Sequence, residues 1–70
     1  MEKLVLREDF IKLGQLLKAM NLVESGVDAK IAVTEGEVKV NGEVEYQRGK
    51  KLRAGDIVEY DGEKILIAEE

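Results

Sequence analysis

Four basic side chains gather within six residues in the second half of the chain, and their types suit them to bind an anion. They lie in the segment QRGKKLRAG, residues 47–55, and are Arg48, Lys50, Lys51 and Arg53. Arginine can hold a phosphate with two parallel hydrogen bonds, whereas lysine meets it as a point charge. A run of charge is equally compatible with a solvated loop. The segment therefore predicts either a phosphate-binding loop or an ordinary surface loop, and in both cases we expect Leu52 to anchor it in the core.

Four further polar residues complete the candidate binding residues: Lys12, Lys18, Lys30 and Asn41. At helical spacing Lys12 and Lys18 fall, with Gln15, on a side of the first predicted helix away from its leucines. Lys30 lies on a different side of the second predicted helix from the small residues that face the core. Each also has an ordinary role, because lysines on helices are commonly solvated and Asn41 precedes a glycine in a turn.

Residues that usually carry catalysis or hold metals are scarce in this chain. It contains no cysteine and no histidine, Ser25 is its only serine, and Thr34 is its only threonine. The commonest general base, the thiolate nucleophile and the usual soft metal ligands are therefore missing. We expect a protein that is not an enzyme and that uses neither a metal nor a cofactor.

Charge is distributed unevenly along the sequence. The formal net charge is −4, with ten Lys and Arg against nine Asp and Glu in residues 1–53, and one against six in residues 54–70. Because salt screens charges beyond about 10 Å, an acidic terminal segment can coexist with a basic patch. No apolar run approaches the roughly 20 residues of a membrane-spanning helix, and no secretory signal is evident. We expect a single domain over residues 1–70 that is monomeric, cytoplasmic and not bound to membranes.

The first predicted helix covers residues 13–20. Its leucines and its methionine follow the spacing of one apolar helix face, and Asn21 can end the helix. Gly14 costs such a helix up to about 1 kcal/mol relative to alanine, which indicates that another backbone comes close to it. A very short turn then leads into the second helix, so the two helices are expected to pack together.

The second predicted helix begins at Ser25, which forms a Ser-x-x-Asp capping pattern with Asp28, and Gly36 can end it. The residues that face the core at helical spacing are Ala29, Ala32 and Val33. Val27 and Ile31 fall on a different face. Either another element covers these two side chains or a small apolar strip is exposed.

Strand patterns flank the helices. Residues 3–7, KLVLR, predict an edge strand, and residues 8–11 a connection. The clearest hairpin joins residues 57–60 to residues 64–67 around Asp61-Gly62. A two-residue turn there places Glu59 opposite Lys64 and Val58 opposite Ile65.

The hairpin around Asn41-Gly42 has two possible registers. A two-residue turn pairs Val40 with Glu43, as the Asn-Gly dipeptide favours. A three-residue turn instead pairs Val38 with Val44, as hydrophobic matching favours, and a one-residue slip exchanges the two faces of the strand. Both tyrosines of the chain, Tyr46 and Tyr60, are expected in the core of the sheet.

Four segments in this order resemble the S4 domain, a small RNA-binding module named after a protein of the small ribosomal subunit. They are LGQLLK at residues 13–18, SGVDAK at 25–30, EGEVKVNGE at 35–43 and RGKKLRAGDIV at 48–58. The resemblance, carried by residues 13–60, covers nearly the whole chain, and the likeness is greatest to small stand-alone bacterial proteins of the YaaA type. The resemblance implies an α+β fold, the αL RNA-binding motif, with two short packed helices against a small, mostly antiparallel sheet.

The resemblance also implies non-catalytic binding of structured RNA, ribosomal or transfer RNA, alone or in a ribosomal particle. Ser25 and Ala29 match the family's Ser-Arg-x-x-Ala-Arg pattern, whereas Lys30 replaces an arginine and Gly26 leaves one cation position empty. A basic patch on the second helix and residues 48–53 would contact phosphates. With three aromatic residues in all, we expect recognition of phosphate and shape. The alternative is a protein-interaction module that kept the fold and lost RNA binding. The net charge and the possible apolar strip favour this alternative.

Overall fold

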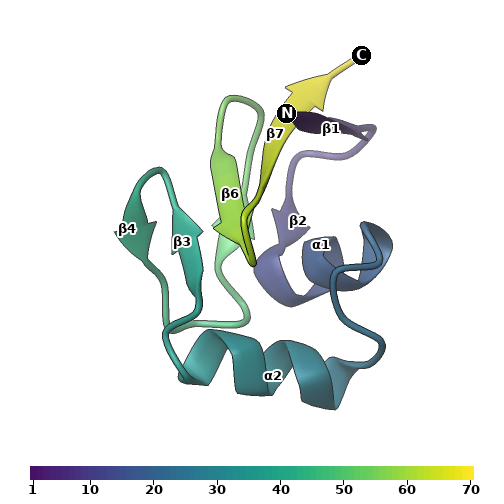
Figure 1. The fold of residues 1–70 in the computed structure, drawn as a ribbon. Helices are drawn as coiled ribbons and strands as arrows, with labels where there is room; N and C mark the ends of the chain where they lie inside the picture. The colour runs from purple at the N-terminus through teal and green to yellow at the C-terminus, as the bar shows by residue number, and fades with distance from the viewer.

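The computed structural model describes all residues, 1–70, as two short helices packed against a five-stranded sheet (Figure 1). The strand order is β1-β7-β6-β3-β4, and only the pair of β1 and β7 is parallel. The α+β prediction with a mostly antiparallel sheet is therefore confirmed, and β1 lies at an edge as expected. No helix has the length and apolar content needed to cross a membrane. The strands of this sheet are β1 Glu2–Leu6, β3 Val38–Val40, β4 Glu43–Val44, β6 Ile57–Tyr60 and β7 Glu63–Glu69.

Two very short strands form a separate antiparallel pair beside the first helix. β2, Ile11–Lys12, pairs with β5, Lys51–Leu52, so that Ile11 lies opposite Leu52 and Lys12 opposite Lys51. The segment 8–11 thus ends in a strand rather than being only a connection, because a two-residue strand is too short to show an alternating pattern. Leu52 is fully buried and anchors the basic segment in the core, as predicted.

The helices are α1, Leu13–Ala19, and α2, Gly26–Thr34. Asn21 adopts a left-handed φ of 57° just after α1, and its N–H donates to the carbonyl of Lys18. Ser25 caps α2, since its Oγ accepts a hydrogen bond of 3.2 Å from the N–H of Asp28. The connection between the helices spans residues 20–25 and is longer than the very short turn predicted.

The Asn41-Gly42 hairpin takes the two-residue register. Val40 lies opposite Glu43, and both turn residues have positive φ, 53° for Asn41 and 85° for Gly42. Only glycine and a few polar residues adopt such a pair of angles readily, so the turn rather than hydrophobic matching sets the register. As a consequence the prediction for Tyr46 was wrong: its side chain is 64% exposed. Tyr60 is partly buried and packs against the core.

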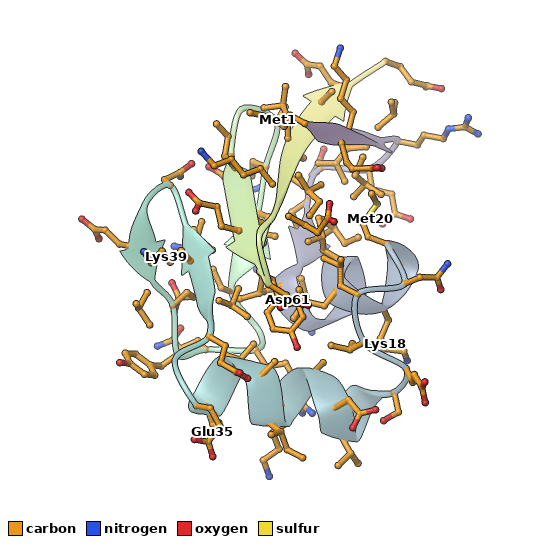
Figure 2. The ribbon with its side chains drawn as sticks, viewed as in Figure 1. Met1, Lys18, Met20, Glu35, Lys39 and Asp61 are labelled. Atoms are coloured by element: carbon orange, nitrogen blue, oxygen red, sulfur yellow. The ribbon has the colours of Figure 1, made fainter.

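The core lies between the sheet and the two helices. It includes the fully buried leucines of α1, the face Ala29, Ala32 and Val33 of α2, and inward side chains of β3, β6 and β7. The β6–β7 hairpin has the predicted register, with Glu59 opposite Lys64 and Val58 opposite Ile65. The strip on α2 is uncovered, since Val27 is 66% and Ile31 50% exposed. Figure 2 shows side chains projecting outward from the lower face of α2.

Candidate nucleic-acid interface

The basic segment crosses the first turn of α1 at very close range. The N–H of Gly14 donates to the carbonyl of Arg48 at 3.0 Å, and the N–H of Leu13 donates to that of Lys50 at 2.9 Å. A Cβ on Gly14 would lie 2.6 Å from Cγ of Arg48. Gly14 therefore admits the basic segment, which confirms the close approach that this glycine indicated. The crossing also satisfies two N–H groups that the start of a helix leaves without partners.

The crossing creates a groove between the two helices that we call the cationic groove. It has a volume of about 280 Å³, and Lys12, Lys18 and Arg48 supply its charges. No carboxylate lines it. Arg48 reaches across it, since Nη1 donates to the carbonyl of Gly26 at 3.4 Å. The full lining is Lys12, Gly14, Gln15, Lys18, Gly26, Ala29, Arg48 and Gly49.

A second pair of cations is held by an aromatic ring next to this groove. Nζ of Lys51 lies 4.8 Å, and Cζ of Arg53 5.7 Å, from the centroid of the Phe10 ring. Such cation–π contacts are worth about 0.5–1 kcal/mol at exposed sites and fix the position of the charge. Lys51 also lies directly opposite Lys12 in the β2–β5 pair. Like charges at that spacing repel each other, so a bound anion would relieve a cost that the free protein bears.

The remaining candidate residues are placed less centrally. Lys50 is exposed beside the crossing, and Lys30 is exposed on α2 one turn after Gly26, without lining the cationic groove. The Asn41 side chain is used within the fold. Its Nδ2 donates to Asp56 at 3.0 Å, and its Oδ1 accepts from the N–H of Ile57 at 2.9 Å. The structure therefore brings Lys12, Lys18 and Arg48 together, places Lys51 and Arg53 next to them, and leaves Lys30 and Asn41 outside the groove.

None of the candidate cations is neutralised by a carboxylate. The single ion pair of the chain joins Arg7 to Glu70 at 3.2 Å, and both side chains are largely exposed. Negative charge collects elsewhere. The pKa of Tyr60 is raised, first by burial and then by the carboxylates of Glu37, Asp61 and Asp28. The acidic total is therefore compatible with a groove of positive potential.

Two residues outside the predicted set, Gln15 and Phe10, also lie where they can take part in binding. Gln15 lines the cationic groove, and its Oε1 accepts a hydrogen bond of 3.2 Å from the N–H of Lys12. Its helical spacing with Lys12 and Lys18 was a usable signal. Phe10 carried no such signal, because its partners Lys51 and Arg53 are more than forty residues away in the sequence.

Comparison with known proteins identifies the family. The sequence model of the S4 domain matches residues 4–68. The chain belongs to the S4 domain family. It is 46% identical to the probable ribosome maturation protein RlbA of Bacillus subtilis over 54 residues. This alignment covers 77% of this chain and 76% of the relative. It is 42% identical to the putative RNA-binding protein YbcJ of Escherichia coli over 57 residues, an alignment that covers 81% of each protein.

The fold of this S4 domain also agrees with a solved structure. The solution structure of YbcJ from Escherichia coli matches with a TM-score of 0.65 and 37% identity, covering 96% of this chain and 84% of that one. That structure is described as revealing an αL motif involved in RNA-binding. The resemblance inferred from four short segments is therefore confirmed over almost the entire chain.

Proposed function

We propose that this S4 domain binds structured RNA without catalysing a reaction, and that the cationic groove is the centre of its contact surface. The observation that carries the proposal is the set Lys12, Lys18 and Arg48, three cations from three segments in a groove without a carboxylate. Phosphate contacts of this kind position a folded RNA by its shape. Lys51 and Arg53 extend the surface along the β2–β5 pair. The likeness to YbcJ, which is named as a putative RNA-binding protein and whose αL motif is described as involved in RNA-binding, supports the proposal.

Ribosomal RNA is the RNA class that we propose first, with transfer RNA second. The support is the relative in Bacillus subtilis, which is named as a probable ribosome maturation protein. On this proposal the protein acts as a monomer in the cytoplasm and meets its RNA in a ribosomal particle or a precursor of one. Lys30, Lys50 and Asn41 remain proposed peripheral contacts.

A salt-dependent titration tests RNA binding. The probe is a fragment of 16S ribosomal RNA, labelled for fluorescence anisotropy, and binding is measured at several salt concentrations. Each neutralised phosphate contributes a slope of about 0.9 in log K against log salt on the duplex DNA scale, so we expect a slope of several units. No binding at low salt to either a ribosomal or a transfer RNA fragment would contradict the proposal.

A matched pair of variants locates the surface. Lys12→Gln/Lys18→Gln removes two charges from the cationic groove, and Lys39→Gln/Lys64→Gln removes two from the five-stranded sheet. Both variants have the same net charge. We expect only the first to lose affinity, by roughly tenfold or more, and to lower the salt slope by about two units. Equal losses would mean that overall charge, not the groove, governs binding.

Binding of another protein is the second candidate, and one observation favours it. Val27 and Ile31 leave an exposed apolar strip on α2. Val27→Gln/Ile31→Gln should leave RNA affinity unchanged if the cationic groove is the site. If instead the variant loses a ribosomal-particle association that the Lys12→Gln/Lys18→Gln variant keeps, the strip and not the groove is the functional surface.

A further inference from the structure

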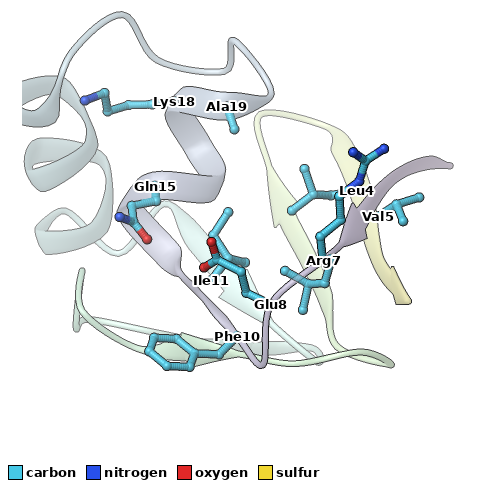
Figure 3. A pocket seen from close by; sticks show the side chains of 10 residues that line it. Leu4, Val5, Arg7, Glu8, Phe10, Ile11, Gln15, Lys18 and Ala19 are labelled. Carbon is cyan, nitrogen blue, oxygen red and sulfur yellow. The ribbon is translucent and has the colours of Figure 1, made fainter. Parts of the chain in front are cut away.

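A second groove lies beside the cationic groove and differs from it in its lining. It has a volume of about 470 Å³ and runs between β1 and α1 (Figure 3). Six of its ten lining residues are hydrophobic: Leu4, Val5, Leu6, Phe10, Ile11 and Ala19. We call it the apolar groove. A concave site with apolar walls and a few polar groups is the usual form of a ligand-binding site.

The two grooves are neighbours. Gln15 and Lys18 line both of them, so one side of α1 forms their common border. A nucleic acid whose phosphates lie along Lys12, Lys18 and Arg48 therefore passes the mouth of the apolar groove. Phe10, at the other side of that mouth, carries Lys51 and Arg53 next to its ring. Positive charge thus lies on two sides of an apolar depression that the carboxylate of Glu8 also lines.

We propose that the apolar groove receives one unpaired base of the bound RNA, which packs against Phe10 while its phosphates stay in the cationic groove. This inference rests on the proposed function and deepens it. Structured RNAs present unpaired bases in loops and bulges, and proteins read these bases by packing them against aromatic rings and by hydrogen bonds to their edges. The feature recognised is then a bulged nucleotide, in addition to phosphate and shape.

Two polar side chains at the apolar groove define the kind of base that it takes. Glu8 and Gln15 both line the groove, Glu8 from the segment after β1 and Gln15 from α1 (Figure 3). Glu8 forms no ion pair, so its carboxylate is free to accept a hydrogen bond. Gln15 has its oxygen engaged with the N–H of Lys12, which leaves its amide hydrogens free to donate. A carboxylate accepts from an exocyclic amino group, as on cytosine or adenine, and it repels phosphate.

The apolar groove also borders the free edge of β1, where an extended peptide could add a strand. Charge favours the base. The border that the two grooves share at Lys18, and the cations on Phe10, suit a polyanion that spans both grooves. A peptide strand would leave this arrangement unused.

The test compares RNA hairpins that differ in one nucleotide. The probes are a hairpin with a single bulged cytidine, the same hairpin fully paired, and a version with a bulged uridine, each titrated by fluorescence anisotropy. Packing of a base on an aromatic ring is worth about 1–3 kcal/mol, so we expect the cytidine bulge to bind at least about fivefold tighter than the paired hairpin. The uridine bulge should fall between them.

Two variants and their controls assign the effect to the groove. Phe10→Leu should reduce the ratio of bulged to paired affinity to about one, whereas Tyr46→Leu, which alters an exposed aromatic residue outside the groove, should keep it. Phe10→Leu can also shift Lys51 and Arg53 and so weaken binding in general. Such a loss affects the bulged and the paired hairpin alike and leaves the ratio of their affinities unchanged. Glu8→Gln should remove the preference for cytidine over uridine, and Glu43→Gln on β4 should not.

The outcomes separate this inference from the function on which it rests. Equal wild-type affinity for bulged and paired hairpins overturns the base site and leaves RNA binding intact. No binding of any hairpin or ribosomal fragment at low salt overturns both. If the preference for the bulged hairpin survives both Phe10→Leu and Glu8→Gln, the base binds elsewhere and the assignment to this groove is overturned.

Discussion

Replacing Gly14 with alanine is a direct test of how the fold presents Arg48. The new Cβ would lie 2.6 Å from Cγ and 3.1 Å from Cδ of Arg48, but 3.6 Å from its carbonyl oxygen. The first distance is a clash and the last an ordinary contact. Cγ belongs to the stem of Arg48, so the methyl group forces the whole side chain into another χ1 rotamer, while the 3.6 Å contact leaves the carbonyl oxygen and its 3.0 Å hydrogen bond from Gly14 in place.

The effect on stability should be small and the effect on binding large. Alanine gains up to about 1 kcal/mol of helix propensity over glycine, and forcing a side chain off its rotamer costs about 0.5–1.5 kcal/mol. The free energy of unfolding should thus stay within about 1 kcal/mol of the wild type. A charge-assisted hydrogen bond is worth about 1.5–3 kcal/mol, so loss of the Arg48 contact should weaken RNA binding by roughly tenfold or more.

The measurement combines urea unfolding with anisotropy titration of the ribosomal RNA fragment at several salt concentrations. The salt slope should fall by about one phosphate contact. Gly26→Ala is the control, because this glycine also borders the cationic groove and an added Cβ there meets nothing within 4 Å. If Gly14→Ala binds RNA as tightly as Gly26→Ala, Arg48 does not contact the RNA and the reasoning is refuted.

Three further changes test individual features of the fold. Ser25→Ala removes the 3.2 Å cap of α2 and should lower the free energy of unfolding by about 1 kcal/mol in urea, whereas Ser25→Asp should retain it. Leu52→Ala empties a fully buried site beneath the basic segment, and we expect a loss of about 2–5 kcal/mol in thermal unfolding followed by circular dichroism; a loss below 1 kcal/mol would mean that Leu52 is no anchor. Because folding raises the pKa of Tyr60, the unfolded chain loses the phenol proton at a lower pH than the folded one. The contribution of Tyr60 to the free energy of unfolding is therefore complete below about pH 10 and is lost as the pH rises through the folded pKa. In Tyr60→Phe the free energy of unfolding in urea should depend less on pH in that alkaline range than in the wild type. The same pH dependence in both proteins would contradict the raised pKa.

Local sequence was sufficient for several elements of this protein. The Ser25 cap, the left-handed end of α2 at Gly36 and the β6–β7 register were all predictable, because each depends on residues within a few positions of one another. The S4 resemblance extended this to the fold. Even the choice at Asn41-Gly42 was contained in the dipeptide, whose backbone preference outweighed the hydrophobic matching that would have buried Tyr46.

Tertiary structure alone decided how the cations are grouped. Lys12 and Lys18 come from one end of the chain and Arg48 from the other, and the space left by the missing side chain of Gly14 sets how they meet. The ring of Phe10 under Lys51 and Arg53 follows from the β2–β5 pair, which is too short to read from a pattern. Periodicity reports which face of an element is buried, but a binding groove depends on distances between elements, and those are fixed only when the core has packed.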